Sequence, residues 1–340
     1  MARAAPVRVG VLGAAGQLGR CLVREIEAAA DLTLAFAATR AEIDVGDVVA
    51  IGPWLDSLTT APGAGVDVVV NAAAMTAVDV CESEVERAHR VNGLAPAAWA
   101  RALSERGIRF MHISTDYVFA GDGTRPYREE DPTDPRSVYG ASKLEGEQGV
   151  LAADPHALVV RTSWVFGPGR NFVVAILEQA RKRRSGEAEG PLRVVDDQRG
   201  RPTYAADLAL ALLVLARRMT TGEEPTGGIL HLCNRGETTW YGFAREALAI
   251  AGYPEIAIDP VPTSAFPTPA TRPAYSVLDC SRAARLGLEM RDWSEALAGY
   301  LRSPDRPKGV LGAGPERSDE ASTGMRQGGQ GGATAGGARG

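Results

Sequence analysis

Tyr139 and Lys143 stand four residues apart in the stretch SVYGASKLEGE, where the sequence predicts that a helix begins. Residues i and i+4 lie on one face of a helix, so the ammonium group of Lys143 can approach the phenol of Tyr139. A free phenol has a pKa of about 10, and a neighbouring cation favours its ionised form. The pair therefore indicates a proton donor or acceptor for catalysis, although a tyrosine packed on a lysine stem would show the same spacing.

A glycine-rich turn supplies the second chemical signal. The predicted strand Val7–Leu12 runs into GAAGQLG, which opens a predicted helix over Gln17–Ala30. Glycines let the backbone approach a pyrophosphate, and a helix N-terminus offers free N–H groups to an anion. The spacing is GxxGxxG rather than the generic GxGxxG, but the strand–turn–helix context predicts a dinucleotide site. The expected cofactor contacts in this turn are Gly13, Gly16, Gln17, Leu18 and Gly19.

The end of the second predicted strand, Leu32–Ala38, indicates which dinucleotide binds. An Asp or Glu there would hold the ribose 2′-OH of NAD. This chain has Thr39 and Arg40 instead, and a hydroxyl with a guanidinium suits the 2′-phosphate of NADP better. The sequence thus favours NADPH, with NADH as an alternative, although Arg40 could equally be a solvated surface residue. Asp44 and Val45 begin a loop that we expect to border the adenine.

Hydroxyl side chains follow another predicted strand, Arg109–Ser114, where Ser114 and Thr115 stand at its carboxyl end. Ligands of open α/β sheets bind at such strand ends. A plain Ser/Thr turn would look the same. Because the glycine turn and the Tyr139–Lys143 pair occur in the same chain, the functional interpretation of Ser114 and Thr115 is the stronger one.

Short apolar runs alternate with helical patterns through the first half of the chain, as in a doubly wound α/β domain with buried parallel strands. The further predicted elements are strands over Val66–Asn71 and Ala157–Thr162, and helices over Glu84–Arg106, Ser142–Ala153, Tyr204–Arg218 and Tyr241–Ala251. Proline is frequent over Pro260–Pro273, which we expect to be a loop. The fold class expected is α/β, a Rossmann-type doubly wound parallel sheet with a smaller C-terminal substrate-binding domain.

The domain boundaries follow from where these patterns change. We expect the NAD(P)-binding domain over residues 1–165, with return segments near 196–218, and mainly substrate binding over residues 166–302. Residues 303–340 are rich in Gly, Ala, Ser and Arg and cannot bury enough apolar surface to order themselves, so they predict a disordered tail.

Composition excludes several classes of function. The 340 residues carry a net charge of −5 and no Lys/Arg-rich stripe with interleaved aromatics, which disfavours nucleic-acid binding. The four cysteines are far apart and the histidines are not clustered, so neither a disulfide framework nor a metal site is expected. No window approaches the roughly 18 apolar residues of a membrane span. These features predict a cytoplasmic protein with reduced thiols.

The chain resembles the extended short-chain dehydrogenase/reductase superfamily and, within it, the dTDP-4-dehydrorhamnose reductase family. The matching stretches are GAAGQLGR (Gly13–Arg20), VVVNAAAMTAVDVCESE (Val68–Glu84), VN (Val91–Asn92), HISTDYVFAGDG (His112–Gly123), VYGASKLEGE (Val138–Glu147), RTSWVFGPGRNF (Arg161–Phe172), DDQRGRPT (Asp196–Thr203), GILHLCNRGETTWYGFA (Gly228–Ala244) and VPTSAFPTPATRP (Val261–Pro273). STDYVF and DQxGxPT are far more specific than the glycine turn, and the similarity covers residues from about 7 to 302.

The resemblance implies a reductase that passes hydride from NAD(P)H to the 4-keto group of dTDP-4-dehydro-6-deoxy-L-mannose, giving dTDP-L-rhamnose. It implies that Tyr139 is the general acid, that Lys143 lowers the pKa of Tyr139 and holds the nicotinamide ribose, and that Thr115 hydrogen-bonds the substrate oxygen. Preorganised donors of this kind stabilise the negative charge that hydride addition builds on a carbonyl oxygen.

By the same likeness, further residues are expected around the two ligands. Ala72, Ala73 and Ala74 line the cofactor, and Thr76, Val78, Tyr117 and Trp164 approach the sugar, though Trp164 could equally be a core residue. Asn171, Gln198 and Arg272 are candidates for the nucleotide part of the substrate, because a guanidinium pairs well with a diphosphate.

Two positions depart from the family pattern. Met75 stands where a histidine is frequent, which leaves the choice of sugar open. Cys21 stands where some members hold a magnesium-linked glutamate at a dimer contact, so no structural metal and no dimer of that kind are expected, while another homodimer stays open. A dihydrostreptose synthase, acting on another dTDP-4-keto-6-deoxysugar, is the main alternative. A nucleotide-binding regulatory subunit, as of methionine adenosyltransferase, is the other, but it would not need the acid.

Overall fold

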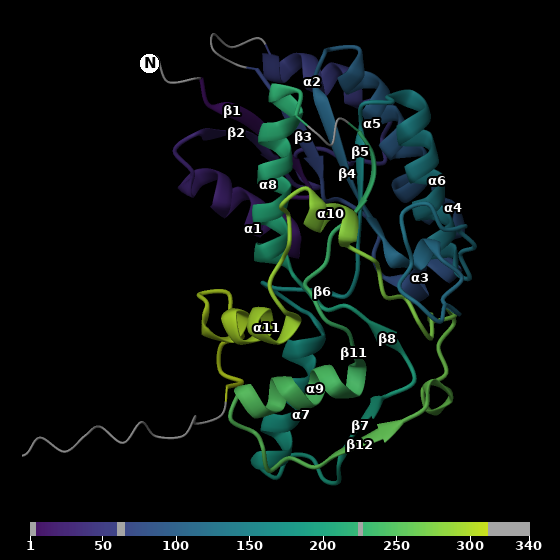
Figure 1. Cartoon of the computed structure of the whole chain (residues 1–340), viewed down its shortest axis with the longest axis vertical. Helices are drawn as coiled ribbons and strands as arrows, with labels where there is room; N and C mark the ends of the chain where they lie inside the picture. Colours follow the sequence, from purple (N-terminus) through teal and green to yellow (C-terminus); the bar gives the residue numbers. More distant parts are fainter. Residues whose placement is uncertain (1–4, 60–64, 224–226, 312–340) are drawn as a thin grey trace, which may run out of the picture.

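The structure is a computed structural model that describes residues 5–59, 65–223 and 227–311. Six parallel strands form its central sheet in the order β10-β5-β4-β3-β1-β2 (Figure 1). They are β1 (Val7–Leu12), β2 (Leu32–Ala38), β3 (Val68–Asn71), β4 (Arg109–Thr115), β5 (Leu158–Thr162) and β10 (Gly228–His231). The expected Rossmann-type α/β fold is confirmed, because these apolar runs are buried between two layers of helices.

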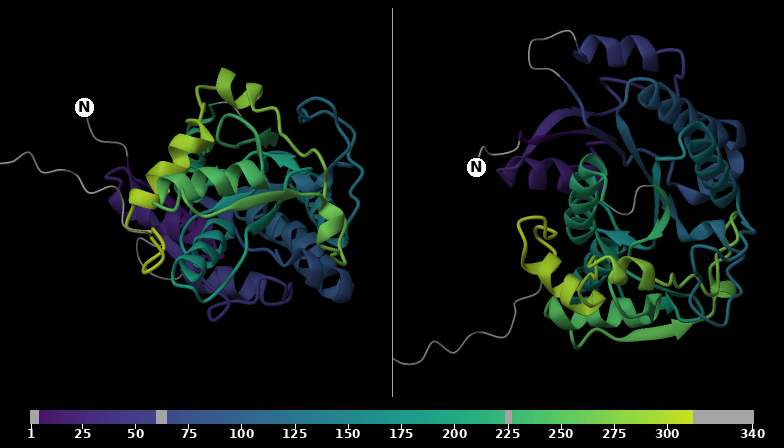
Figure 2. Two further views of the ribbon diagram at one scale, coloured as in Figure 1. Left: turned by 90° about the horizontal axis from the view of Figure 1, so that it is seen from below. Right: turned by 45° about the horizontal axis from the view of Figure 1, so that its top comes forward.

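The two faces of the sheet carry different helices (Figures 1 and 2). Side chains alternate along β3, so Val68 and Val70 join the core under α1 (Gln17–Ala28) and α8 (Ala205–Thr221). Val69 points the other way, into the core shared with α2 (Ile51–Thr59) and α5 (Ala95–Ser104). Helix α6 (Val138–Ala153) packs beside α5 and completes this layer.

The predicted helix Glu84–Arg106 is not uniform. It consists of α4 (Val85–Ala88), a π-helical turn η1 (His89–Leu94) and α5, and it follows the short α3 (Val78–Ser83). A π-turn widens the helix by one residue and is frequent at functional sites. Here it places Asn92 so that its side chain bonds the backbone N–H (2.8 Å) and C=O (3.1 Å) of Met75.

Much of the second half of the chain forms a smaller, mostly helical region at one end of the sheet (Figure 1). Its helices are α7 (Phe172–Arg184), α9 (Trp240–Ile250) and α11 (Trp293–Arg302), whereas α10 (Ser281–Arg285) packs against β10 of the sheet. Its short strands pair as β12 (Ile258–Val261) with β7 (Leu192–Val195), β11 (Thr238–Thr239) with β8 (Arg199–Gly200), and β6 (Val165–Phe166) with β9 (Thr203–Tyr204). The remaining turns are η2 (Asp116–Val118) and η3 (Thr263–Ala265). The predicted proline-rich loop thus begins inside a strand, β12.

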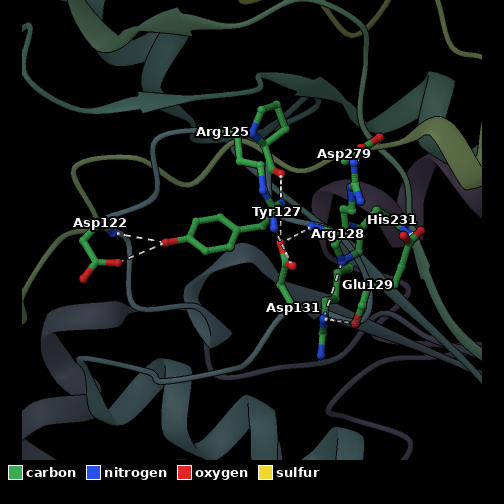
Figure 3. Close-up of polar contacts among 10 residues, drawn as sticks. Asp122, Arg125, Tyr127, Arg128, Glu129, Asp131, His231 and Asp279 are labelled. Carbon is green, nitrogen blue, oxygen red and sulfur yellow. Dashed lines mark hydrogen bonds and ion pairs between the residues drawn. The ribbon is translucent and has the colours of Figure 1, made fainter.

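The long connection between β4 and α6 ties the two regions together (Figure 3). The backbone of Tyr127 donates to Val277 O (2.8 Å) and accepts from Asp279 N (2.7 Å). The carboxylate of Glu129 accepts from the backbone N–H of His231 in β10 (3.1 Å). These contacts, with the bidentate pair between Arg125 and Asp131, make the connection a fixed part of the fold.

Two expectations about order and boundaries are wrong. Helix α6 begins at Val138 rather than Ser142, because the side chain of Ser137 caps it by accepting from Gly140 N (3.2 Å). Residues 303–311, predicted to belong to a disordered tail, pack on the fold instead: Val310 is buried and its carbonyl accepts from the Tyr253 hydroxyl (2.9 Å). The rest of that predicted tail, 312–340, lies outside the described residues. Across the described ranges, the helices are all too short or too polar to span a membrane.

Candidate active site

A cavity of about 310 Å³ opens at the carboxyl ends of β1, β2 and β3, next to the point where the strand order reverses. Most of the expected cofactor residues line it: Gly13, Gly16, Thr39, Arg40, Asp44, Val45, Ala72, Ala73 and Ala74. Residues that were not predicted also line it, namely Ala15, Ile43, Met75, Arg87, Arg90 and Val91. Its wall therefore combines a glycine turn, small apolar residues and three arginines.

Glycines shape the turn for close packing. Gly13 has a φ of +76°, and a Cβ there would lie 2.7 Å from the backbone nitrogen of Ala73. A Cβ on Gly19 would lie 2.2 Å from the carbonyl oxygen of Gly13, so Gly19 allows α1 to pack against the turn. Gln17, Leu18 and Gly19 are not among the lining residues of the cavity, and Leu18 belongs to the core.

The rim after β2 carries both a cation and a carboxylate. The strand itself ends in Ala38, and the carboxylate of Glu42 accepts from both the N–H (2.8 Å) and the hydroxyl of Thr39, so both Thr39 donors are paired in this structure. Arg40 is 74% exposed and only loosely paired with Asp44 (3.8 Å), so its guanidinium is available to a ligand. These residues would hold the adenosine phosphate end of NADPH.

The predicted catalytic residues meet where β4 ends and α6 begins. Tyr139 is in the first turn of α6, partly exposed, with its ring edge-on to the Tyr117 ring at 5.5 Å. The side chain of Thr115 lies next to its hydroxyl. Gly140 makes this approach possible, because a Cβ there would lie 2.2 Å from Tyr117 O.

The structure places the charged end of Lys143 away from the phenol of Tyr139. Burial raises the pKa of the Tyr139 phenol, and the neighbouring side chain of Thr115 offsets only part of that rise. Lys143 does not act on the phenol, because its Nζ lies against β4, 2.7 Å from Ile113 O and 3.1 Å from His112 Nε2. Burial also lowers the pKa of Lys143 to about 8.

Asp116 supports the hydroxyl of Thr115. The Thr115 Oγ1 donates to Asp116 Oδ1 (3.0 Å) and accepts from Tyr117 N (3.3 Å). Burial raises the pKa of Asp116 to about 7, although its hydrogen bond with Thr115 opposes the rise. The sequence shows Asp116 only as part of the STDYVF motif, and nothing in the motif itself indicates its burial.

A second cavity, of about 290 Å³, lies in the smaller region. Two of the residues expected at the nucleotide, Gln198 and Arg272, line it, with the unpredicted residues Phe172, Ile176, Arg193, Val194, Val195, Trp240, Thr263, Phe266 and Thr268. Gln198 is held by Trp240 Nε1 (3.0 Å) and Thr263 Oγ1 (2.9 Å). Arg272 donates to Asp79 Oδ2 (2.7 Å), and its other terminal nitrogen is buried without a partner among the described residues.

The remaining predicted substrate residues do not gather in one cavity. Trp164 is not simply core: it is partly exposed, stacks on Trp240 with ring centroids 3.6 Å apart, and has a φ of 46°, a strain that functional sites often hold. Asn171 caps α7 and donates to Gly167 O (2.6 Å), so its amide is used structurally and does not line the cavity. Thr76 is exposed and Val78 opens α3, and neither lines the two cavities.

The position where a metal-linked glutamate was discussed, Cys21, is fully buried in α1, and burial raises the pKa of its thiol to about 12. Within the part of the chain that the structure describes, no three His, Cys, Asp or Glu side chains gather as metal ligands would.

Comparison with known proteins decides the family. A family model described as the RmlD substrate binding domain matches residues 7–305. The chain belongs to this family. A dTDP-4-dehydrorhamnose reductase from Mycolicibacterium smegmatis is 41% identical over 294 residues, covering 85% of this chain and 84% of that protein. A probable dTDP-4,6-dihydroxy-2-methyloxan-3-one 4-ketoreductase from Streptomyces antibioticus is 41% identical over 290 residues, covering 84% and 92%.

The fold of this RmlD-family chain agrees with solved structures. The dTDP-4-dehydrorhamnose reductase from Bacillus anthracis in complex with NADP is 30% identical, has a TM-score of 0.77, and covers 87% of this chain and 99% of its own. The resemblance read from the motifs is thus confirmed. Cavity residues outside the motifs, such as Arg87 in the first cavity and Arg193 in the second, are placed there only by the fold.

Proposed function

We propose that this chain reduces the 4-keto group of dTDP-4-dehydrorhamnose with NADPH, giving dTDP-L-rhamnose. The observation that carries the proposal is the placement of Tyr139, in the first turn of α6, beside Thr115 at the carboxyl end of β4. It stands in a chain that is 41% identical to a dTDP-4-dehydrorhamnose reductase and shares its fold with a reductase solved with NADP. A regulatory subunit would not need this proton donor.

NADPH, when bound, supplies the hydride that adds to the keto carbon. The protein's part is to hold and protonate the oxygen that becomes an alkoxide. Tyr139 donates its hydroxyl proton to that oxygen. Thr115 lies beside it, and its single hydroxyl proton, which is donated to Asp116 in this structure (3.0 Å), would have to turn from Asp116 to the substrate oxygen to stabilise the alkoxide. A phenol with a raised pKa is fully protonated at neutral pH, so Tyr139 already carries the proton that the reduction needs before the substrate binds.

The nucleotide part of the substrate fits the second cavity. Arg193 and Arg272 carry the positive charge that a diphosphate needs, and the unpartnered nitrogen of Arg272 is a free donor for it. Trp240 and Phe266 offer aromatic surface to the thymine ring, and Gln198 offers an amide. Trp164, stacked on Trp240, is then placed beside the sugar.

The cofactor preference rests on the rim after β2. Arg40 would receive the 2′-phosphate of NADPH, and Thr39 could join it once Glu42 releases its donors, whereas β2 itself ends in Ala38 and not in a carboxylate that would hold the ribose of NADH. We also place the enzyme in the cytoplasm, because its four cysteines are free. The proposal does not depend on a homodimer, and the oligomeric state is to be measured.

A substrate comparison tests the proposal. Purified enzyme with NADPH is given dTDP-4-dehydro-6-deoxyglucose with and without a 3,5-epimerase, and the product is identified by mass spectrometry and NMR. Cofactor oxidation that requires the epimerase and yields dTDP-L-rhamnose supports the proposal. Turnover without the epimerase would instead favour reduction of another dTDP-4-keto-6-deoxysugar, the second candidate, because a ketoreductase with a different named substrate is equally identical to this chain. Within that candidate, a dihydrostreptose synthase would be recognised by its product.

A further inference from the structure

Lys143 ends a chain of buried hydrogen bonds that runs away from Tyr139. Asn71, His112 and Lys143 are each at most 2% exposed. Asn71 Nδ2 lies 3.1 Å from His112 Nδ1, and His112 Nε2 lies 3.1 Å from Lys143 Nζ. Lys143 Nζ also donates to Ile113 O (2.7 Å). Since water does not reach these groups, each contact must pair one donor with one acceptor.

The orientation of the Asn71 side chain determines which atom donates and which accepts in each of these hydrogen bonds. The backbone N–H of Ala73 donates to Asn71 Oδ1 (3.0 Å), which sets the orientation of the amide, so its NH₂ group faces His112 Nδ1. Nδ1 must therefore be the acceptor. Burial holds the pKa of His112 well below its ordinary value, so the ring is neutral and carries a single proton. That proton must be on Nε2, which faces Lys143.

We infer that His112 is a positioning residue that donates its Nε2–H to Lys143 and so favours the amine form of this lysine over its ammonium form. An ammonium has only donors, so a charged Lys143 would oppose the Nε2–H, whereas an amine has a lone pair to accept it. The inference rests on the proposed function only in that Lys143 belongs to the catalytic set. It also explains why Lys143 leaves the phenol of Tyr139 unaided in this state.

The surrounding charges are compatible with an uncharged lysine. Glu147, one turn further along α6, favours the charged form of Lys143, but its carboxylate is taken by Arg161 of β5 through Nε (2.9 Å) and Nη2 (2.6 Å). From η1, His89 faces α6 and pairs with Glu145 there. Burial of Lys143 outweighs Glu147 and lowers its pKa to about 8 before the donor on His112 is considered.

The tautomer of His112 can be measured without any variant. The chain has four histidines, so ¹⁵N spectra of protein labelled in its imidazole rings contain signals from only four rings. We expect His112 to be neutral with its proton on Nε2 across neutral pH, with the signal assigned by its loss in His112→Phe. A proton on Nδ1 would overturn the inference, because Lys143 would then be the donor.

The protonation of Lys143 can be read directly as well. The chain has only three lysines, Lys143, Lys182 and Lys308, so protein labelled at lysine Cε gives three signals, assigned with Lys182→Arg and Lys308→Arg. We expect Lys143 to titrate at about 8 or below, well under the ordinary lysine value of about 10.4. A midpoint near 10 for Lys143 would contradict the inference.

The direction in which the pKa of Lys143 changes in His112→Phe shows whether His112 donates or accepts the hydrogen bond with Lys143. His112→Phe keeps the burial and removes the ring nitrogens, so it should raise the pKa of Lys143 by about one unit, a tenfold change in the ratio of its two forms. A fall would mean that His112 had been accepting from an ammonium. His112→Gln, which restores an amide N–H, should return the midpoint toward wild type, and His156→Phe, at an exposed histidine, should leave it unchanged. None of these readouts needs substrate, so the inference and the proposed function can fail separately.

Discussion

Replacing Asp116 by Asn should stabilise the protein at alkaline pH and have progressively less effect as the pH falls. Asp116 is 1% exposed, and its pKa is raised from 3.8 to about 7 by burial. A carboxyl group whose pKa is higher in the folded state weakens the fold as it ionises, so the loss begins above about pH 4 and is complete above about pH 7. Three pH units at about 1.4 kcal/mol each give a change of about 4 kcal/mol. Asparagine does not ionise, and its side-chain oxygen can still accept from Thr115.

Urea unfolding of both proteins over this pH range measures the effect. The difference in unfolding free energy between Asp116→Asn and wild type should grow by about 4 kcal/mol from about pH 4 to about pH 8. Asp259→Asn, at an exposed aspartate, is the matched control for the loss of a carboxylate. A constant difference for Asp116→Asn would show that Asp116 is ionised in the fold throughout, which would refute the reasoning from its burial.

Three further changes test other parts of the structure. Glu147→Ala leaves the 2%-exposed guanidinium of Arg161 without its partner and should cost about 3–5 kcal/mol in urea unfolding; a loss below about 1 kcal/mol would mean that water reaches the pair. Arg40→Gln should weaken NADPH binding about 10–100-fold in calorimetry and leave NADH binding unchanged, and an equal loss for both would remove Arg40 from the 2′-phosphate. Gly19→Ala puts a Cβ 2.2 Å from Gly13 O and should lower the unfolding free energy of the protein by about 1–3 kcal/mol. An unchanged Tm would show that the glycine turn can move to accommodate the added methyl group.

Much of the sheet could be predicted because its signals are local. The strands Val7–Leu12 and Leu32–Ala38 have the predicted bounds, since a buried parallel strand needs only a short apolar run between turn residues. The cofactor cavity was predictable for a related reason: Gly13 and Thr39 directly follow strands that the topology brings to one edge. For such residues, position along the strand determines position in space.

The contacts that decide the chemistry were not local and could not be predicted. The sequence places Lys143 on the same helical face as Tyr139, but it does not show that His112 and Ile113, 30 residues or so earlier, draw the lysine side chain to β4. Likewise, Asn171 looks like a ligand residue, although capping of α7 uses its amide. The sixth strand, β10, lies beyond the predicted return segments, because its pairing with β5 is a long-range contact with no periodic signal.

The most direct test of the whole account is a single-turnover measurement of hydride transfer with Tyr139→Phe. The account predicts that the variant folds and binds NADPH as wild type does, because the phenol hydroxyl does not line the cofactor cavity, while the rate of reduction of dTDP-4-dehydrorhamnose falls by roughly 10²–10⁴-fold. A rate within a few-fold of wild type, with intact NADPH binding, would contradict it, since the proton would then come from another group.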